Sequence, residues 1–394
     1  MGEIVIVGGG LTAARVAESY RDSGGRDRVT LLASEHHPPY HRPPLTKRLL
    51  RGEAEPPDTL VATLEDFREL DVELRLGMPA ASLDLGARTV TLGSGRDIAY
   101  ERLVIATGAA PRKLAVPGTD LDGVRTLRTL DDSLALREAA GSARRVVVVG
   151  TGFIGLEVTA SLRARGVEVT IVDGGAAPFK ALGAPAFSAF LVDLYRDRGV
   201  EMLLDDGIEG FFGNGEVKVV RTASGRDIEA DLVVVGVGVA PSTGWLEDSG
   251  LELDNGVLVD SRFQASVDNV FAAGDVANFE DPIFKRRRRI EHWSNADYQG
   301  RLLGKVLAGE DVSYDRVSAF FTELFGTVYR FFGDNEGADR QELEGSFADG
   351  RAALRYFDGH RLRAALATGL SDEEQEELEG RIRHDATGIQ REAA

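Results

Sequence analysis

The stretch Glu3–Val16, EIVIVGGGLTAARV, decides how the rest of the chain is interpreted. Four apolar residues run directly into three glycines, and a helical pattern follows at once. This order predicts a buried parallel strand, a tight turn and a helix start. Gly8 permits the turn, Gly10 lets a pyrophosphate approach the backbone, and Ala13 stands where a third glycine usually allows close packing of helix and strand. We therefore expect a dinucleotide site at this turn.

The composition sets limits on the class of protein. A chain of 394 residues is long enough for two or three domains. The net charge of −18 argues against general nucleic-acid binding. Without cysteine, the chain has no disulfide, thiolate metal site or redox dithiol, which suits a reducing compartment such as the cytoplasm. A core strand that begins at residue 3 leaves no room for a signal peptide, and no run of about 18 apolar residues predicts a membrane span.

A second dinucleotide motif is more complete than the first. Arg145–Val158 reads RVVVVGTGFIGLEV and holds all three glycines of the fingerprint, Gly150, Gly152 and Gly155. The next predicted strand places Asp173 at its end, 23 residues after Gly150. A carboxylate at that point accepts from the 2′-hydroxyl of NAD and repels a 2′-phosphate, so the motif predicts NADH rather than NADPH.

The first motif lacks such a clear acid. Its second strand is Arg28–Leu32, RVTLL, and strand alignment puts Ala33 or Ser34 at the position that an acid usually occupies. Glu35 follows directly. A contact from Ser34 or Glu35 to the ribose of an adenosine and a plain solvated loop are both compatible with the sequence.

The segment His36–Arg51, HHPPYHRPPLTKRLLR, is stiffened by four prolines. Its three histidines fit no common metal-ligand spacing, so we predict a surface loop and no metal site. Leu45–Leu50 reads as a short helix. A rigid segment at this point can turn Arg42 and Lys47 back over the nucleotide.

Two strand exits later in the chain have the small residues that a cofactor requires. The strand Leu103–Ala106 ends in Thr107 and Gly108, whose bare backbone could face a bound cofactor, although a plain strand exit has the same composition. In DNVFAAGDV, Asp275 can accept from a ribityl hydroxyl while the backbone on either side meets phosphate or flavin.

Two further features belong to the second motif's part of the chain. Thr129 is the expected N-cap of a helix, and Arg128 before it is a candidate phosphate contact. Gly236 and Gly238, in the run ADLVVVGVGVAP, would line the nicotinamide side of the site.

Lys285–Arg289 is a run of five basic residues in an acidic protein. It is either a solvated strand or a docking patch for an acidic partner. Trp293, close by, either lies against the cofactor or is a core tryptophan. The last part of the chain changes to aromatic strands and a helix capped by Ser371, which indicates a small α+β domain.

These patterns predict an α/β fold with two Rossmann-like domains and a small C-terminal α+β domain. We expect a discontinuous first dinucleotide-binding domain at 1–112 and 241–315, to which the resemblance described next assigns FAD, an NAD-binding domain at 113–240 and a C-terminal domain at 316–394.

The order of motifs, GGGLTAA, HRPPLTK, ATG, LRTLDD, GTGFIGLE, GVGVAP, AAGD and IEHWSNA, resembles the FAD-dependent pyridine nucleotide-disulfide oxidoreductase superfamily, in its ferredoxin and rubredoxin reductase branch. The resemblance covers about residues 3 to 310 and implies FAD on the first fold and NADH on the second. It also implies a charged pair, Lys47 and Glu157, near the flavin ring. The expected NAD-binding residues are Gly150, Gly152, Phe153, Ile154, Gly155, Asp173, Gly236 and Gly238. The expected FAD-binding residues are Gly8, Gly10, Leu11, Thr12, Ala13, Ser34, Glu35, Arg42, Lys47, Ala80, Ala106, Thr107, Gly108, Arg112, Arg128, Gly274, Asp275, Glu291, His292, Trp293 and Phe321.

The resemblance implies hydride transfer from NADH to FAD and then single-electron transfer to an iron–sulfur protein. Without cysteine the flavin must pass electrons directly to an external acceptor, which we expect to be an acidic ferredoxin or rubredoxin docked near Lys285–Arg289. One departure is Phe321-Thr322-Glu323, where the family commonly has Trp-Ser-Asp. An NADH diaphorase or quinone reductase, and a redox-responsive interaction protein like apoptosis-inducing factor, are the alternatives. The sequence leaves monomer and homodimer both open.

Overall fold

In the computed structural model, residues 2–388 are described and form two compact units. Unit 1 comprises 2–41, 59–110 and 240–320, and unit 2 comprises 42–58, 111–239 and 321–388. The chain passes between them within strands β8 (Ala109–Pro111) and β17 (Val239–Pro241), among other points. The predicted division into three domains stays a prediction.

Unit 1 is built on a five-stranded parallel sheet. Its order is β19 (Val270–Ala272), β7 (Arg102–Ile105), β1 (Glu3–Val7), β2 (Arg28–Leu32) and β3 (Val72–Arg75). Its central strands are almost wholly buried, as their continuous apolar runs predict. The unit also contains α3 (Leu64–Glu69) and two three-stranded sheets, β4 (Ala80–Asp84), β5 (Thr89–Leu92) and β6 (Asp97–Ala99), and β18 (Val257–Val259), β20 (Ala277–Asp281) and β21 (Arg286–Arg289).

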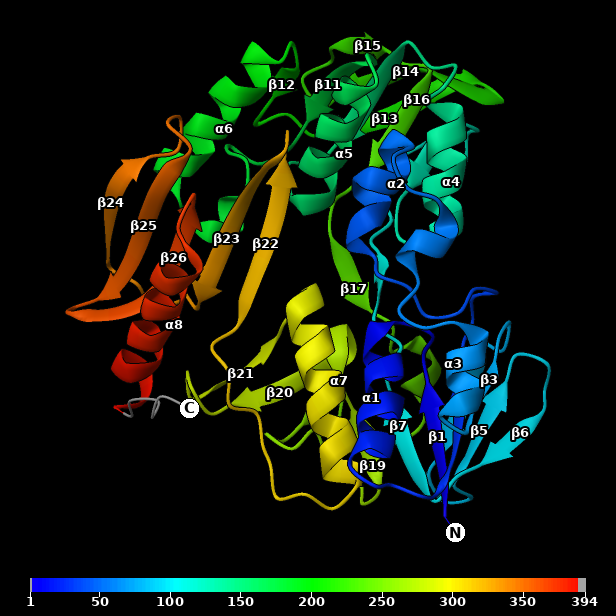
Figure 1. Ribbon diagram of the computed structural model, residues 1–394. Coiled ribbons are helices and arrows are strands. Elements are labelled where there is room, and N and C mark those ends of the chain that lie inside the picture. The colour runs from blue at the N-terminus through cyan, green and yellow to red at the C-terminus, as the bar shows by residue number, and fades with distance from the viewer. Residues whose placement is uncertain (1, 389–394) are drawn as a thin grey trace. The chain divides into compact units, whose positions relative to one another are not determined.

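Two helices far apart in the chain lie side by side in unit 1 (Figure 1). They are α1 (Leu11–Asp22) and α7 (Trp293–Leu307). Their close approach depends on two glycines of α7. A Cβ at Gly300 would lie 2.7 Å from the carbonyl oxygen of Thr12, and one at Gly304 would lie 2.7 Å from the backbone nitrogen of Tyr20.

Unit 2 contains a second five-stranded parallel sheet. Its order is β12 (Glu201–Leu203), β11 (Glu168–Val172), β10 (Arg145–Val149), β16 (Leu232–Val235) and β9 (Val124–Thr126). The helices of this part are α2 (Arg48–Arg51), α4 (Leu130–Ala139), α5 (Phe153–Ala164) and α6 (Pro185–Asp197). A small antiparallel sheet consists of β13 (Ile208–Asn214), β14 (Glu216–Thr222) and β15 (Asp227–Glu229). The expected cap of α4 is confirmed, because the Thr129 hydroxyl accepts from the backbone N–H of Asp132.

The C-terminal part of the chain forms a third five-stranded sheet, covered by one helix (Figure 1). The strand order is β22 (Ala319–Leu324), β23 (Thr327–Gly333), β26 (Arg361–Thr368), β25 (Arg351–Asp358) and β24 (Arg340–Ser346), and the helix is α8 (Asp372–Thr387). Ser371 caps α8 as predicted. The two parallel sheets and this antiparallel one confirm the predicted α/β fold class with a small additional α+β part.

The predicted helix Leu45–Leu50 is confirmed only for Arg48–Leu50, because the chain is interrupted at Lys47. The structure has a 3₁₀ turn, Pro43–Thr46, then a break at Lys47 (φ −124°, ψ −108°), and only then α2. The carbonyl oxygen of Thr46 accepts from the Ser161 hydroxyl at 2.6 Å rather than from a helical N–H. A tertiary hydrogen bond therefore ends the turn where local propensity favours its continuation.

We expect Gly304→Ala to destabilise the protein by about 1–3 kcal/mol, because the added methyl group overlaps backbone atoms of α1. The matched control is Gly380→Ala in α8, where a Cβ meets no atom within 4 Å. That change should stabilise by about 0.5–1 kcal/mol through helix propensity. Denaturant unfolding of both variants measures the difference, and equal effects would contradict the close packing of α1 on α7.

Candidate functional site: two glycine loops and a buried ion pair

The first glycine loop follows the carboxyl end of β1. Gly8 has φ of 140°, and a Cβ there would lie 2.1 Å from the carbonyl oxygen of Ala106, so no side chain fits. Gly10 is the N-cap of α1, and a Cβ there would meet no atom within 4 Å. The two glycines therefore have different roles, since Gly8 is required by the packing of the chain and Gly10 leaves space for a ligand.

The start of α1 has the properties of an anion site. No side chain caps it, and its first turn, which begins with Leu11, Thr12 and Ala13, contains no acidic residue. The first N–H groups of a helix have no partner within the helix and carry partial positive charge. The loop thus fits the pyrophosphate of a dinucleotide.

Residues from the last chain segment of unit 1, 240–320, pack against this loop. A Cβ at Gly274 would lie 2.4 Å from the Thr12 hydroxyl oxygen, and the Gly274 N–H donates to Oε1 of buried Gln299 at 2.7 Å. The Thr12 hydroxyl itself donates to the carbonyl of Ala296. The sequence patterns predicted Thr12, Gly274 and Asp275 as site residues, but they did not indicate Gln299. The available signal was the QGRLLG pattern, Gln299–Gly304, in a segment read as helix.

The acid of the second motif has no counterpart in the first. The Gly8 N–H donates to the carbonyl of Leu32, as the Gly150 N–H donates to that of Val172, so Ala33 occupies the position of Asp173. Ser34 is exposed. Glu35 accepts a hydrogen bond from the Tyr40 hydroxyl at 2.5 Å, which orients its carboxylate. Ribose contacts from Ser34 or Glu35 stay a prediction.

Trp293 is not a core residue. It begins α7 with 38% of its surface exposed, and its indole N–H donates to Nδ1 of His41 at 3.0 Å. The neighbouring His292 ring stacks on Phe320 with centroids 4.0 Å apart. Burial lowers the pKa of His292 to about 4, so its imidazole is neutral near pH 7. Glu291 pairs with Arg289.

The other expected FAD residues of unit 1 lie at strand ends. Ala80 begins β4, and Ala106 follows β7. The Thr107 hydroxyl donates to the carbonyl of Ser242 at 3.0 Å, and Gly108 has φ of 68°. These contacts order the strand exit, and its role at a cofactor stays a prediction.

Unit 2 repeats the loop geometry of unit 1 after β10. A Cβ at Gly150 would lie 2.4 Å from the carbonyl oxygen of Gly236, and one at Gly155 would lie 2.0 Å from that of Gly150. At Gly152, the N-cap of α5, a Cβ would meet no atom within 4 Å. Phe153 and Ile154 begin this helix, which again has no capping side chain and no acid in its first turn. The loop fits a second pyrophosphate.

Asp173 lies at the end of β11, as predicted, and its carboxylate is already oriented by the protein. One oxygen accepts from the N–H and the hydroxyl of Thr151, at 2.5 and 2.6 Å, and the other accepts from the N–H of Gly175 at 2.6 Å. Sequence reasoning missed Thr151, although it stands inside the GTG motif. The stem of Lys180 also approaches this loop, because its Cδ would lie 4.0 Å from a Cβ at Gly175.

The predicted charged pair is present and almost completely buried. The Lys47 ammonium lies 2.5 Å from Oε2 of Glu157, and both side chains are less than a tenth exposed. Lys47 comes from the break before α2, and Glu157 comes from the first half of α5. Two hydroxyls complete the group: Thr46 donates to Oε2 at 2.6 Å and Thr322 donates to Oε1 at 2.8 Å.

The remaining expected FAD residues of unit 2 are Arg42, Arg112, Arg128 and Phe321. Arg42 donates to the carbonyl of Arg128. The Arg112 N–H donates to the carbonyl of Gly238 at 2.9 Å, which links an expected FAD residue to an expected NAD residue. Phe321 is 37% exposed. Their roles as cofactor contacts stay predictions.

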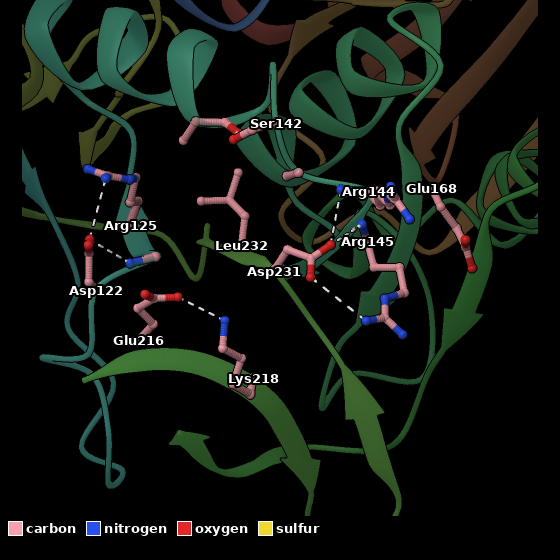
Figure 2. A pocket seen from close by; sticks show the side chains of 13 residues that line it. Asp122, Arg125, Ser142, Arg144, Arg145, Glu168, Glu216, Lys218, Asp231 and Leu232 are labelled. Carbon is pink, nitrogen blue, oxygen red and sulfur yellow. Dashed lines mark hydrogen bonds and ion pairs between the residues drawn. The ribbon is translucent and has the colours of Figure 1, made fainter. Parts of the chain in front are cut away.

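A groove of about 790 Å³ in unit 2 is not the candidate site (Figure 2). It lies at the amino ends of β10, β11 and β16, whereas the glycine loop follows the carboxyl end of β10. Ligands of open α/β sheets bind outside the carboxyl ends. Six of its charged side chains also pair with one another: Arg125 with Asp122, Lys218 with Glu216, and Arg145 with Asp231.

The basic run Lys285–Arg289 is largely neutralised. Arg287 pairs with Glu280 at 2.7 Å, and Arg288 pairs with buried Asp281 at 3.1 Å. Burial raises the pKa of Asp281, and Arg288 opposes that shift. With Arg289 bound to Glu291, at least three of the five cations have a carboxylate partner, and the side chains of Arg288 and Arg289 are only 12% and 9% exposed. Docking near this run stays a prediction.

Comparisons with known proteins agree with this geometry. The family described as pyridine nucleotide-disulphide oxidoreductase matches residues 2–300. The chain belongs to this family. It is 34% identical to the ferredoxin–NAD(+) reductase subunit of a benzene 1,2-dioxygenase system from Pseudomonas putida, over 92% of this chain and 88% of that protein. It is also 34% identical to rhodocoxin reductase from Rhodococcus erythropolis, over 91% and 84% of the two chains.

A solved structure shares the fold over nearly the whole chain. The crystal structure of a covalent putidaredoxin reductase–putidaredoxin complex matches with a TM-score of 0.93 and 30% identity, over 96% of this chain and 93% of that chain. Family membership confirms the predicted resemblance and the predicted cofactors: the chain is a flavoprotein oxidoreductase that uses FAD and NAD(H).

No helix between residues 2 and 388 is long and apolar enough to cross a membrane. In the same part of the chain, no three or more histidine, aspartate or glutamate side chains are grouped so that they could hold a metal ion. His41, one of the three histidines of the proline-rich segment, instead accepts from Trp293.

We expect Asp173→Ala to lower kcat/KM for NADH about 10- to 100-fold, mainly through KM, because a charged hydrogen-bond acceptor for the ribose is lost. Activity with NADPH should fall less or rise, since the repulsion of a 2′-phosphate is removed while Lys180 stays nearby. Steady-state kinetics with both nucleotides measure the ratio. An unchanged preference for NADH would contradict the assignment of Asp173.

Proposed function

We propose that the chain is an NADH:ferredoxin reductase that supplies electrons to an oxygenase system. The observation that carries the proposal is the presence of two glycine loops, each before an uncapped helix start, in a chain without cysteine. The loops accommodate two dinucleotides, and no dithiol is available to take electrons from the flavin. The printed names of the relatives, reductases of dioxygenase ferredoxins and of rhodocoxin, support an iron–sulfur protein as the acceptor.

Residues of the first loop would hold the FAD pyrophosphate, and those of the second loop and Asp173 would hold NADH. Bound FAD supplies the redox chemistry, because it takes the hydride of NADH and releases the two electrons one at a time. The protein orients both nucleotides and excludes water. Lys47, held by Glu157, would place a positive charge near the flavin ring, where it favours the reduced form.

The test is NADH-dependent reduction of cytochrome c with and without an added [2Fe–2S] ferredoxin. We expect ferredoxin to stimulate the rate at least tenfold, because the small protein carries single electrons from the flavin to the haem. NADH–ferricyanide activity, which needs no protein acceptor, is the control. Equal cytochrome c rates with and without ferredoxin would favour a diaphorase or quinone reductase instead.

We also propose that the acidic ferredoxin docks near Lys285–Arg289. Lys285 supports this location, because it is exposed at the turn before β21 with φ of 54°. Since NADH is generated and consumed inside cells, we place the reaction in the cytoplasm.

Lys285→Glu should raise KM for ferredoxin several-fold at low salt, and the effect should shrink as salt screens the interaction. The matched control is Lys305→Glu, an identical charge reversal at an exposed position of α7. Ferredoxin titrations at two ionic strengths measure both variants. If the two variants behave alike, the docking site lies elsewhere.

A further inference from the structure

We propose that Thr322 is a positioning residue for the reaction: it fixes the orientation of the Glu157 carboxylate, which in turn holds Lys47. This inference rests on the proposed function, because it concerns the charge that Lys47 presents near the flavin. Thr322 lies on β22, more than 160 positions after Glu157 in the chain.

The two oxygens of the Glu157 carboxylate have different partners. Oε2 is shared by the Lys47 ammonium at 2.5 Å and the Thr46 hydroxyl at 2.6 Å. Oε1 accepts from the Thr322 hydroxyl at 2.8 Å. Thr322 thus holds the second carboxylate oxygen, so the carboxylate is fixed at both oxygens and cannot rotate without losing a hydrogen bond.

The group is shielded from water, so each of these hydrogen bonds is electrostatically stronger than it would be in water. Glu157, Lys47, Thr46 and Thr322 are each less than a tenth exposed. If the Thr322 hydroxyl were removed, Oε1 would be a buried acceptor that has lost this hydrogen bond. Such an acceptor turns toward the remaining donors, and these are the groups that now bind Oε2.

Thr322 and its two neighbours in β22, Phe321 and Glu323, lie on opposite faces of the strand and therefore have different partners. Side chains alternate along a strand, so Phe321 and Glu323 point to the face opposite Thr322. Phe321 is 37% exposed, and Glu323 reaches Arg51 at 3.6 Å. The hydroxyl of Thr322 is therefore the polar group that β22 adds to the ion pair itself.

The reaction would depend on this hydroxyl through the placement of Lys47. A loosened Glu157 lets the ammonium move, so the positive charge favours the reduced flavin less. We expect Thr322→Val, which keeps the shape and removes the hydroxyl, to make the flavin midpoint potential more negative. Reduction of the bound flavin by NADH should slow about tenfold.

The experiment compares variants of the FAD-loaded protein by redox titration, by stopped-flow reduction with NADH and by thermal unfolding. Thr322→Ser keeps the hydroxyl and should restore the wild-type potential. Thr322→Ala, read against Thr322→Ser, gives a second test of the hydroxyl should Thr322→Val fold poorly. Thr368→Val is the matched control, because Thr368 is also a buried threonine of the C-terminal sheet, and its hydroxyl donates to the carbonyl of Val328 instead.

A double-mutant cycle distinguishes positioning from a general structural role. If Thr322 acts through Glu157, then Thr322→Val should have little further effect on the potential in a Glu157→Gln background. The inference is overturned if Thr322→Val and Thr322→Ala keep the wild-type potential, if Thr368→Val shifts it equally, or if the effects of Thr322 and Glu157 add fully. Failure of the wild-type protein to bind FAD or to be reduced by NADH would instead overturn the proposed function.

Discussion

The structure depends on a single constraint that occurs twice, a buried parallel strand that runs into a helix whose glycine N-cap supplies no side chain to bind the first N–H groups. Such groups are costly to leave unsatisfied, and most helices satisfy them with a capping side chain. Here the N-caps are Gly10 and Gly152, and each has open space around it. Each favourable contact between a helix start and an anion contributes about 0.3–1 kcal/mol, so a bound pyrophosphate offsets what the missing caps cost.

The buried ion pair is the second feature that folding alone does not explain. Removing both charges of such a pair in favour of apolar residues is often neutral or stabilising, whereas removing one partner typically costs about 3–5 kcal/mol. Lys47 and Glu157 are kept inside unit 2 with Thr46 and Thr322 as additional partners. A carboxylate with donors on both oxygens is held in one orientation, so the protein also fixes the position of the Lys47 ammonium.

The local elements of the fold could be predicted because their signals lie within a few residues. The strands β1, β2, β10 and β11 end where the apolar runs end, and Thr129 and Ser371 cap the helices that follow them. The predictions failed where a distant residue competes with local propensity. Ser161 takes the carbonyl of Thr46 and interrupts the expected helix.

The sequence by itself determined the two dinucleotide folds, the preference for NADH and the absence of a thiol relay, because strand, glycine and acid spacings act over short distances and cysteine is absent from the composition. Only the tertiary structure decided which residues orient the acids. Thr151 binds Asp173 and Thr322 binds Glu157, and no spacing in the chain relates the partners in the second pair. Hydrogen bonds of this kind depend on where buried side chains meet after folding, and a pattern of residue types does not contain that information.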